Sequence, residues 1–130
     1  MKAISIYSVG SCDTASRIGS YDALIDYEGR TKRLHRELHD TTVNRCIAQG
    51  LIDAVIALKK SCQLKLTTAT ALGTSKSAPK KGINTDVVHE LLHELAKGGH
   101  QFDFDVREGQ GEQLRKLIMS HPLNSSKNNS

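Results

Sequence analysis

The chain has 130 residues, of which 38% are hydrophobic and 25% are charged, and its formal net charge is +4. A chain of this length fits one domain with a sizeable core, and it lacks the run of roughly 18 apolar residues that a membrane-spanning helix needs. Three widely spaced cysteines without a Cys-x-x-Cys pair indicate reduced thiols. We therefore expect a cytoplasmic protein without a signal peptide and with no membrane among its partners.

Three strands are expected in the first part of the chain, because apolar and polar residues alternate there. The alternation covers residues 2–8, 21–27 and 32–38. Glu28 and Gly29 supply a tight turn between the second and third segments. The three strands would therefore be consecutive and antiparallel.

A helix is expected next, with Thr41 or Thr42 as its cap and an apolar stripe within residues 43–58. Gly50 lies in this stripe, where a glycine costs the helix about 1 kcal/mol relative to alanine. We expect close packing against another backbone to offset that cost.

The second half of the chain alternates between strand and helix patterns. Strands are expected at 63–68 and 102–106, and helices at 86–97, capped by Thr85, and at 112–119. A basic loop occupies residues 73–84. Residues 1–120 would form one domain, and the polar residues 121–130 a disordered tail. The order βββαβαβα predicts an α+β domain of three layers, in which helices flank a five-stranded mixed sheet.

Several of these segments carry motifs that resemble a known family. Ser8-Val9-Gly10-Ser11-Cys12 is similar to the Thr-Asp-Gly-Ser-Cys that ends the first strand of bacterial ribonuclease HI. Thr41-Thr42-Val43-Asn44-Arg45 resembles the entry into the first helix of that family. The resemblance covers roughly residues 3–119 and implies a ribonuclease H-like fold.

Members of this family bind two metal ions with four carboxylates, and the ions activate water for hydrolysis. The residues that the resemblance places at these four positions are Val9, Ile47, Ala69 and Arg115, and Gln110 falls at the position of a loop histidine. None of the four offers the oxygen ligands that Mg²⁺ requires. No replacement pair is expected from the other acids on related segments, which are Asp13, Asp53 and Asp105. We therefore predict a catalytically inactive domain, with no catalytic residue, no bound metal and no cofactor.

Nucleic-acid binding does not depend on those carboxylates, since phosphate contacts need little beyond positive charge. The resemblance implies contacts from Gly10, Ser11 and Asn44, next to Arg45, and the basic loop adds Lys76, Lys80 and Lys81. RNA or an RNA–DNA hybrid is the nucleic acid that the resemblance implies. The alternative function is a protein–protein interaction domain with no nucleic-acid role. The simpler interpretation of the same lysines is an ordinary solvated loop.

A different motif points to a second alternative. His89-Glu90-Leu91-Leu92-His93 matches the H-E-x-x-H pattern of zinc-dependent hydrolases, in which two histidines on one helix face bind the metal and the glutamate acts as general base. No third ligand follows at the expected spacing, because His100 lies seven residues after His93. The simpler interpretation places His89 and His93 on the polar face of an amphipathic helix.

Overall fold

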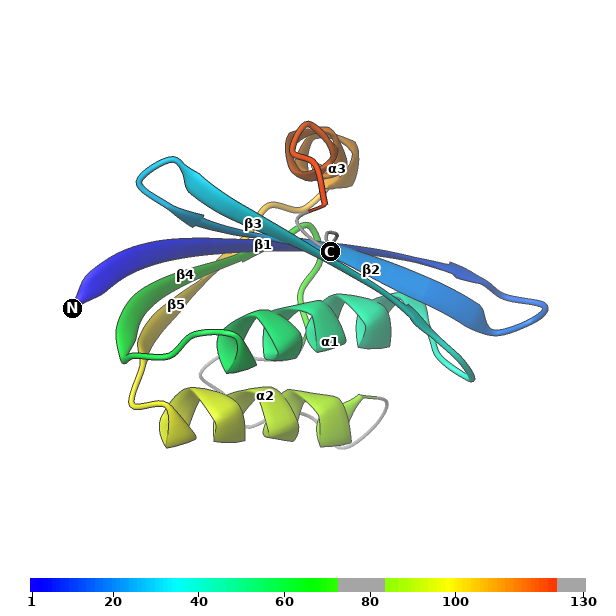
Figure 1. The fold of residues 1–130 in the computed structure, drawn as a ribbon. Helices are drawn as coiled ribbons and strands as arrows, with labels where there is room; N and C mark the ends of the chain where they lie inside the picture. The colour runs from blue at the N-terminus through cyan, green and yellow to red at the C-terminus, as the bar shows by residue number, and fades with distance from the viewer. Residues whose placement is uncertain (73–83, 124–130) are drawn as a thin grey trace.

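The computed structural model describes residues 1–72 and 84–123. The elements follow one another as β1 (Lys2–Asp13), β2 (Ile18–Tyr27), β3 (Arg30–Leu38), α1 (Val43–Ile56), β4 (Cys62–Thr68), α2 (Thr85–Lys97), β5 (Gln101–Val106) and α3 (Gly111–Met119) (Figure 1). The predicted element order βββαβαβα is therefore confirmed.

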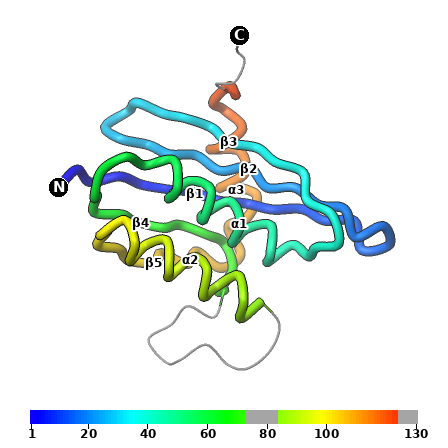
Figure 2. Tube along the Cα trace, turned by 60° about the horizontal axis from the view of Figure 1, so that its bottom comes forward, coloured from blue at the N-terminus to red at the C-terminus, as the bar shows by residue number. Residues whose placement is uncertain are grey.

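The strands form one sheet in the order β3-β2-β1-β4-β5. β1 pairs antiparallel with β2 and parallel with β4, so the sheet is mixed, as predicted. Helices α1 and α2 run side by side along one face of the sheet, and α3 lies on the opposite face (Figures 1 and 2). This is the three-layer α+β arrangement that the sequence predicts.

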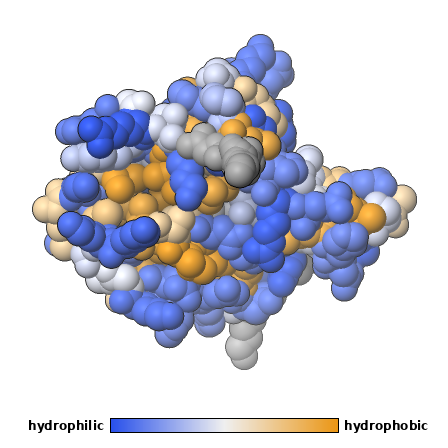
Figure 3. All heavy atoms as spheres, in the orientation of Figure 1, coloured by the Kyte–Doolittle hydropathy of each residue, from blue (hydrophilic) through white to orange (hydrophobic). Residues whose placement is uncertain are grey.

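Each face of the sheet has its own core, because side chains alternate between the faces along a strand. On the side of α1 and α2, residues such as Ile6, Leu51 and Leu91 are fully buried in the larger cluster. On the side of α3, a smaller cluster holds Val9, Leu24, Leu114 and Ile118. In Figure 3, apolar residues gather between the sheet and α1, while hydrophilic residues cover the outer strands and α2.

Strand β1 is longer than its alternating pattern indicates, since it continues past Ser8 and pairs with β2 as far as Asp13 opposite Ile18. The hairpin is closed by the Asp13 carboxylate, which accepts hydrogen bonds from the Ser16 hydroxyl at 2.8 Å and from the backbone N–H groups of Ala15 and Ser16. These hydrogen bonds lower the pKa of Asp13 below its usual value, and the bond from the Ser16 hydroxyl has the largest effect.

The cap of α1 is Thr42, whose side chain accepts a hydrogen bond from the Arg45 N–H at 3.3 Å. The cap proposed for α2 is wrong: Thr85 is the first helical residue, and Asn84 precedes it with a left-handed backbone, φ +75°.

The close packing expected at Gly50 is present, but the neighbouring groups are side chains and not another backbone. A Cβ at this position would lie 3.0 Å from the Tyr21 ring and still closer to Ser8 Oγ.

Two sequence predictions fall on residues outside the described ranges. The basic loop with Lys76, Lys80 and Lys81 is one, and residues 124–130 of the expected tail are the other. His121, at the start of that tail, contacts the sheet, because its carbonyl accepts a hydrogen bond from Arg33 at 3.1 Å. Within residues 1–72 and 84–123, no helix is both long and apolar enough to cross a bilayer.

Candidate functional site

A pocket of about 290 Å³ opens where the middle of β1, the start of α1, the end of β4 and the start of α3 meet. It arises because β1 and β4 are parallel neighbours, so the chain after β4 emerges beside Gly10 and meets both helices. Gly10 allows the close approach, since a Cβ there would lie 3.0 Å from the Val43 carbonyl oxygen. The residues that line the pocket are Ser8, Val9, Gly10, Val43, Asn44, Ile47, Ala69, Thr70, Gly111 and Arg115.

All four residues that the resemblance places at metal-ligand positions line this one pocket. Val9 and Ile47 are buried, at 4% and 5% exposure, and contribute apolar walls from β1 and α1. Ala69 follows β4, and Arg115 reaches in from α3. Gln110, at the position of the loop histidine, is the residue just before α3 and is exposed.

Among the described residues, no carboxylate lines the pocket. Asp53 is held elsewhere by the Tyr21 hydroxyl at 2.5 Å and by Arg36 at 2.9 Å. Asp105 pairs with Arg107 at 2.9 Å, and Asp13 closes the β1–β2 hairpin. In the parts of the chain that the structure describes, no three His, Cys, Asp or Glu residues are grouped so as to hold a metal ion.

Arg115 supplies the positive charge of the pocket. Its Nη2 donates a hydrogen bond of 3.0 Å to the carbonyl oxygen of Gly10, which joins α3 to β1. Within the described ranges, Gly10 is its only hydrogen-bonding partner. The guanidinium therefore keeps further N–H donors available.

Sequence reasoning missed one buried acid near this pocket. Asp22 lies on β2 directly opposite Val9 and is only 4% exposed. Its carboxylate accepts hydrogen bonds from Arg33 at 2.8 Å and His35 at 3.1 Å. Because β3 provides both partners, Asp22 belongs to a buried ion pair within the sheet rather than to the pocket. The alternation of β2 places Asp22 beside Leu24 on one face, but nothing in the sequence indicated that this face would be covered.

The residues proposed for nucleic-acid binding divide into two groups. Gly10 and Asn44 line the pocket, and Ser11 is exposed one residue further along β1. Arg45 turns instead toward α2 and binds Asp86 through two hydrogen bonds of 2.8 and 2.9 Å. This contact lowers the pKa of Asp86 to about 2 and raises the pKa of Arg45.

The H-E-x-x-H residues lie away from the pocket, on the outer face of α2. His89, Glu90 and His93 are all exposed. His100 is not available as a third ligand on that face, because its Nδ1 accepts a hydrogen bond from the Cys62 N–H at 3.0 Å. In the described part of the chain, the two histidines therefore stand without a third metal ligand.

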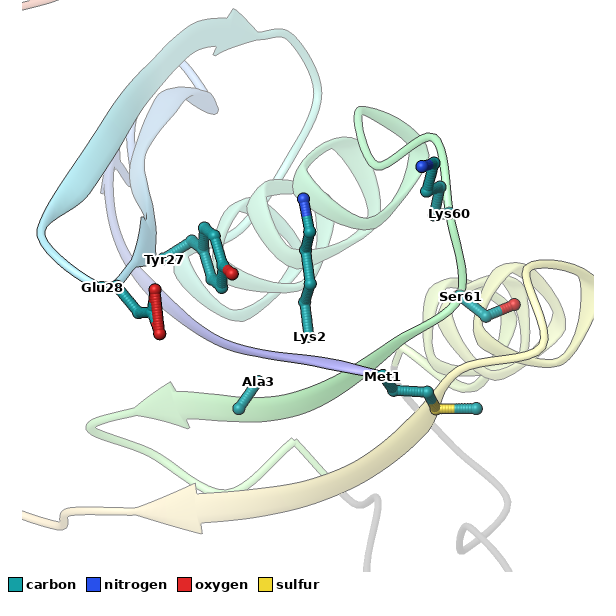
Figure 4. A pocket seen from close by; sticks show the side chains of 7 residues that line it. All are labelled: Met1, Lys2, Ala3, Tyr27, Glu28, Lys60 and Ser61. Carbon is teal, nitrogen blue, oxygen red and sulfur yellow. The ribbon is translucent and has the colours of Figure 1, made fainter.

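A second pocket, of about 560 Å³, lies at the opposite end of β1 (Figure 4). Lys2 places its ammonium 5.0 Å from the centre of the Tyr27 ring, and Lys60 comes from the connection between α1 and β4. Roughly seven residues of β1, or about 23 Å of strand, separate Lys2 from Val9. The two pockets are therefore separate sites.

Comparison with known proteins confirms the ribonuclease H resemblance. The chain is 36% identical over 67 residues to a ribonuclease H of Zymomonas mobilis, an alignment that covers 52% of this chain and 43% of the relative. It is 37% identical over 65 residues to ribonuclease HI of Pseudomonas aeruginosa, covering 50% of this chain and 44% of the relative. The chain thus spans less than half the length of these curated relatives. No family model matches the chain.

A solved structure shares the fold. The chain superposes on LC9-RNase H1, described as a type 1 RNase H with the type 2 active-site motif, with a TM-score of 0.70 and 17% sequence identity. The match covers 92% of this chain and 72% of the other. The domain therefore has a ribonuclease H-like fold, as the sequence predicts.

Proposed function

We propose that this ribonuclease H-like domain is catalytically inactive and acts as a binding module for nucleic acid, namely RNA or an RNA–DNA hybrid. The observation that carries the proposal is the lining of the 290 Å³ pocket, which joins Val9, Ile47 and Ala69 to Arg115. The fold supports the link to nucleic acid, and the chemistry of the pocket argues against hydrolysis.

The absence of catalysis follows from the ligand chemistry of divalent ions. Mg²⁺ binds through oxygen atoms in a near-octahedral shell and keeps its waters unless carboxylates are present. Valine, isoleucine and alanine side chains offer no oxygen, and the Arg115 guanidinium repels a cation. A pair of ions that activates water and stabilises the leaving oxygen has nothing to hold it here.

Binding is supported by the groups around the mouth of the pocket. Gly10 and Asn44 line the pocket, Ser11 follows Gly10 on β1, and Arg115 adds a positive charge to the lining. The first turn of α1, which includes Asn44, carries no acidic residue that would repel a phosphate. Together with a net charge of +4, this makes the region suited to a phosphate backbone.

The binding test is a fluorescence anisotropy titration of the full chain with RNA–DNA hybrid, double-stranded RNA, double-stranded DNA and single strands at two salt concentrations, with EDTA present. We expect hybrid or RNA to bind and the affinity to fall steeply with salt. Asn44→Ala should weaken binding, whereas Lys60→Met, which removes a charge at the far end of β1, serves as the matched surface control. Absence of binding to every nucleic acid would contradict the proposal.

The catalytic half of the proposal has a separate test. Incubation of the labelled hybrid with Mg²⁺ or Mn²⁺ should leave it intact at protein concentrations well above those needed for binding. Cleavage that survives repurification and is lost in a folded pocket variant such as Ala69→Leu would show that the domain is an enzyme.

A further inference from the structure

We propose that the 290 Å³ pocket is a binding site for a small organic acid, specifically a monocarboxylate attached to an apolar body. This inference goes beyond nucleic-acid binding and does not depend on it. It rests on the combination, within one concave site, of apolar walls and a guanidinium with unused donors.

The apolar residues that line the pocket favour a ligand with an apolar part. Val9, Val43, Ile47 and Ala69 enclose the pocket from β1, α1 and the segment after β4. Val43 remains 40% exposed although it belongs to the apolar stripe of α1, so a ligand in the pocket would cover surface that the protein itself leaves open. Removal of such surface from water favours an apolar ligand over a strongly hydrated one.

The polar groups select a carboxylate. The guanidinium of Arg115 carries five N–H donors, and the Gly10 carbonyl engages only one of its nitrogens. A planar guanidinium binds a planar carboxylate through two parallel hydrogen bonds. The half-buried side chain of Asn44 makes no hydrogen bond with the described residues, so its amide is also free to donate to a carboxylate oxygen.

The size and charge of the site narrow the ligand further. Pockets for drug-sized ligands occupy roughly 300–1,000 Å³, and this one lies at the lower limit with about 290 Å³. Arg115 is the only charged residue in the lining that the structure describes, and it balances one negative charge. A free phosphate dianion would be less well matched, because it lacks an apolar part and would leave the walls exposed.

The test is an NMR titration of the ¹⁵N-labelled full chain with hexanoate, in which the amide signals of Gly10 and Gly111 report on the pocket. We expect saturable shifts at both residues, weaker binding of acetate, and no saturable binding of hexanol. Arg115→Met should weaken hexanoate binding on the order of tenfold or more, since a hydrogen bond to a charged group is lost. Arg107→Met is the matched control, because Arg107 pairs with Asp105 and does not line the pocket.

A second variant tests the pocket without removing the guanidinium, so that the test does not depend on the folding of Arg115→Met. Ala69→Leu keeps the guanidinium but fills the space beside it, and it should also abolish the hexanoate shifts. Three results would overturn the proposal: no saturable shift at Gly10 and Gly111, unchanged affinity in a folded Arg115→Met variant, or inorganic phosphate binding more tightly than hexanoate. Hybrid binding is measured in a separate titration, and none of these results would by itself show that the hybrid fails to bind, so the two proposals fail separately.

Discussion

The guanidinium of Arg115, on one face of the sheet, reaches the carbonyl oxygen of Gly10 at 3.0 Å and fixes α3 against the middle of β1. These residues are 105 positions apart in the sequence, so the pocket exists only when the whole domain is folded. The same contact explains why the lining can be positively charged without an acidic partner: a backbone carbonyl, rather than a carboxylate, orients the arginine. The guanidinium of Arg115 is therefore held in place, and no carboxylate among the described residues pairs with it.

Introducing four carboxylates into the pocket should create a metal site. We expect the combined variant Val9→Asp, Ile47→Glu, Ala69→Asp and Arg115→Asp to bind Mn²⁺, because all four side chains line one pocket and carboxylate oxygens are suitable ligands. Isothermal titration calorimetry should detect this binding, with none for the wild-type chain. The metal-free variant should be less stable, since like charges then face one another in a half-buried site, and Mn²⁺ should raise its melting temperature.

The triple variant that keeps Arg115 is the matched control for this experiment. Its guanidinium would pair with the new carboxylates and compete with the ion, so we expect much weaker Mn²⁺ binding. Equal binding by the triple and quadruple variants would show that Arg115 does not face the position of the ion.

Gly50→Ala should destabilise the protein although alanine is the better helix former. The added Cβ would collide with Ser8 Oγ and lie 3.0 Å from the Tyr21 ring, both in fully or almost fully buried positions. Overpacking of this kind costs about 1–3 kcal/mol, more than the roughly 1 kcal/mol gained in helix propensity. Urea unfolding measures the difference.

The double variant Gly50→Ala with Ser8→Ala tests whether the collision with Ser8 Oγ causes the loss of stability. Removal of the Ser8 hydroxyl takes away the nearest obstacle, although it also breaks the 2.9 Å hydrogen bond to the Ile47 carbonyl. The two changes should therefore cost less together than the sum of their separate costs. Strict additivity would mean that Ser8 is not what makes Gly50 necessary.

Much of this fold could be predicted from local patterns. Alternation identified the strands and helical spacing identified the helices. The motifs around Gly10 and Asn44 led, through the family resemblance, to four distant residues that line one pocket. Local patterns could not predict which residue each charged side chain would pair with. Arg45 follows Asn44 in the motif, yet it binds Asp86 on α2. This pair forms because α1 and α2 pack side by side in the folded domain, which no local pattern indicates (Figure 2).

The buried Asp22 was missed for a related reason. An acid that alternates with apolar residues looks solvent-facing in the sequence, and the side chains that contact Asp22 come from another strand, β3. β2 and β3 pair so that Asp22 lies directly opposite His35, and Arg33 reaches it from the same strand. No spacing rule within β2 contains that information.

Arg33→Met should destabilise the domain strongly, by about 3–5 kcal/mol, because it leaves the buried Asp22 carboxylate without its main partner. His35 offers only part of the compensation, since it is charged only when protonated. Arg17→Met provides the matched control: Arg17 pairs with Asp40 at the same distance, 2.8 Å, but both side chains are more than half exposed. That change should cost no more than about 1 kcal/mol. Equal costs for the two variants in urea unfolding would contradict the assigned burial of Asp22.

The contact between Asp86 and Arg45 should make the stability depend on pH in the acidic range. The folded-state pKa of Asp86 is lowered to about 2, first of all by the hydrogen bond from Arg45, whereas an unfolded aspartate titrates near a pKa of about 3.9. A lowered folded pKa gives stability that is present above about pH 4 and is lost as the pH falls toward about 2.

Asp86→Asn should therefore flatten the dependence of the unfolding free energy on pH between about 4 and 2. Arg45→Met should flatten it in large part but less than Asp86→Asn, because the Arg45 hydrogen bond is the largest cause of the lowered pKa and the backbone N–H groups of Val87 and Asp86 also contribute. Arg45→Met should change the slope no further once Asp86 is replaced. If Asp86→Asn kept the wild-type slope, acid unfolding would have to come from other carboxylates, and Arg45 would be free to take part in the proposed nucleic-acid binding.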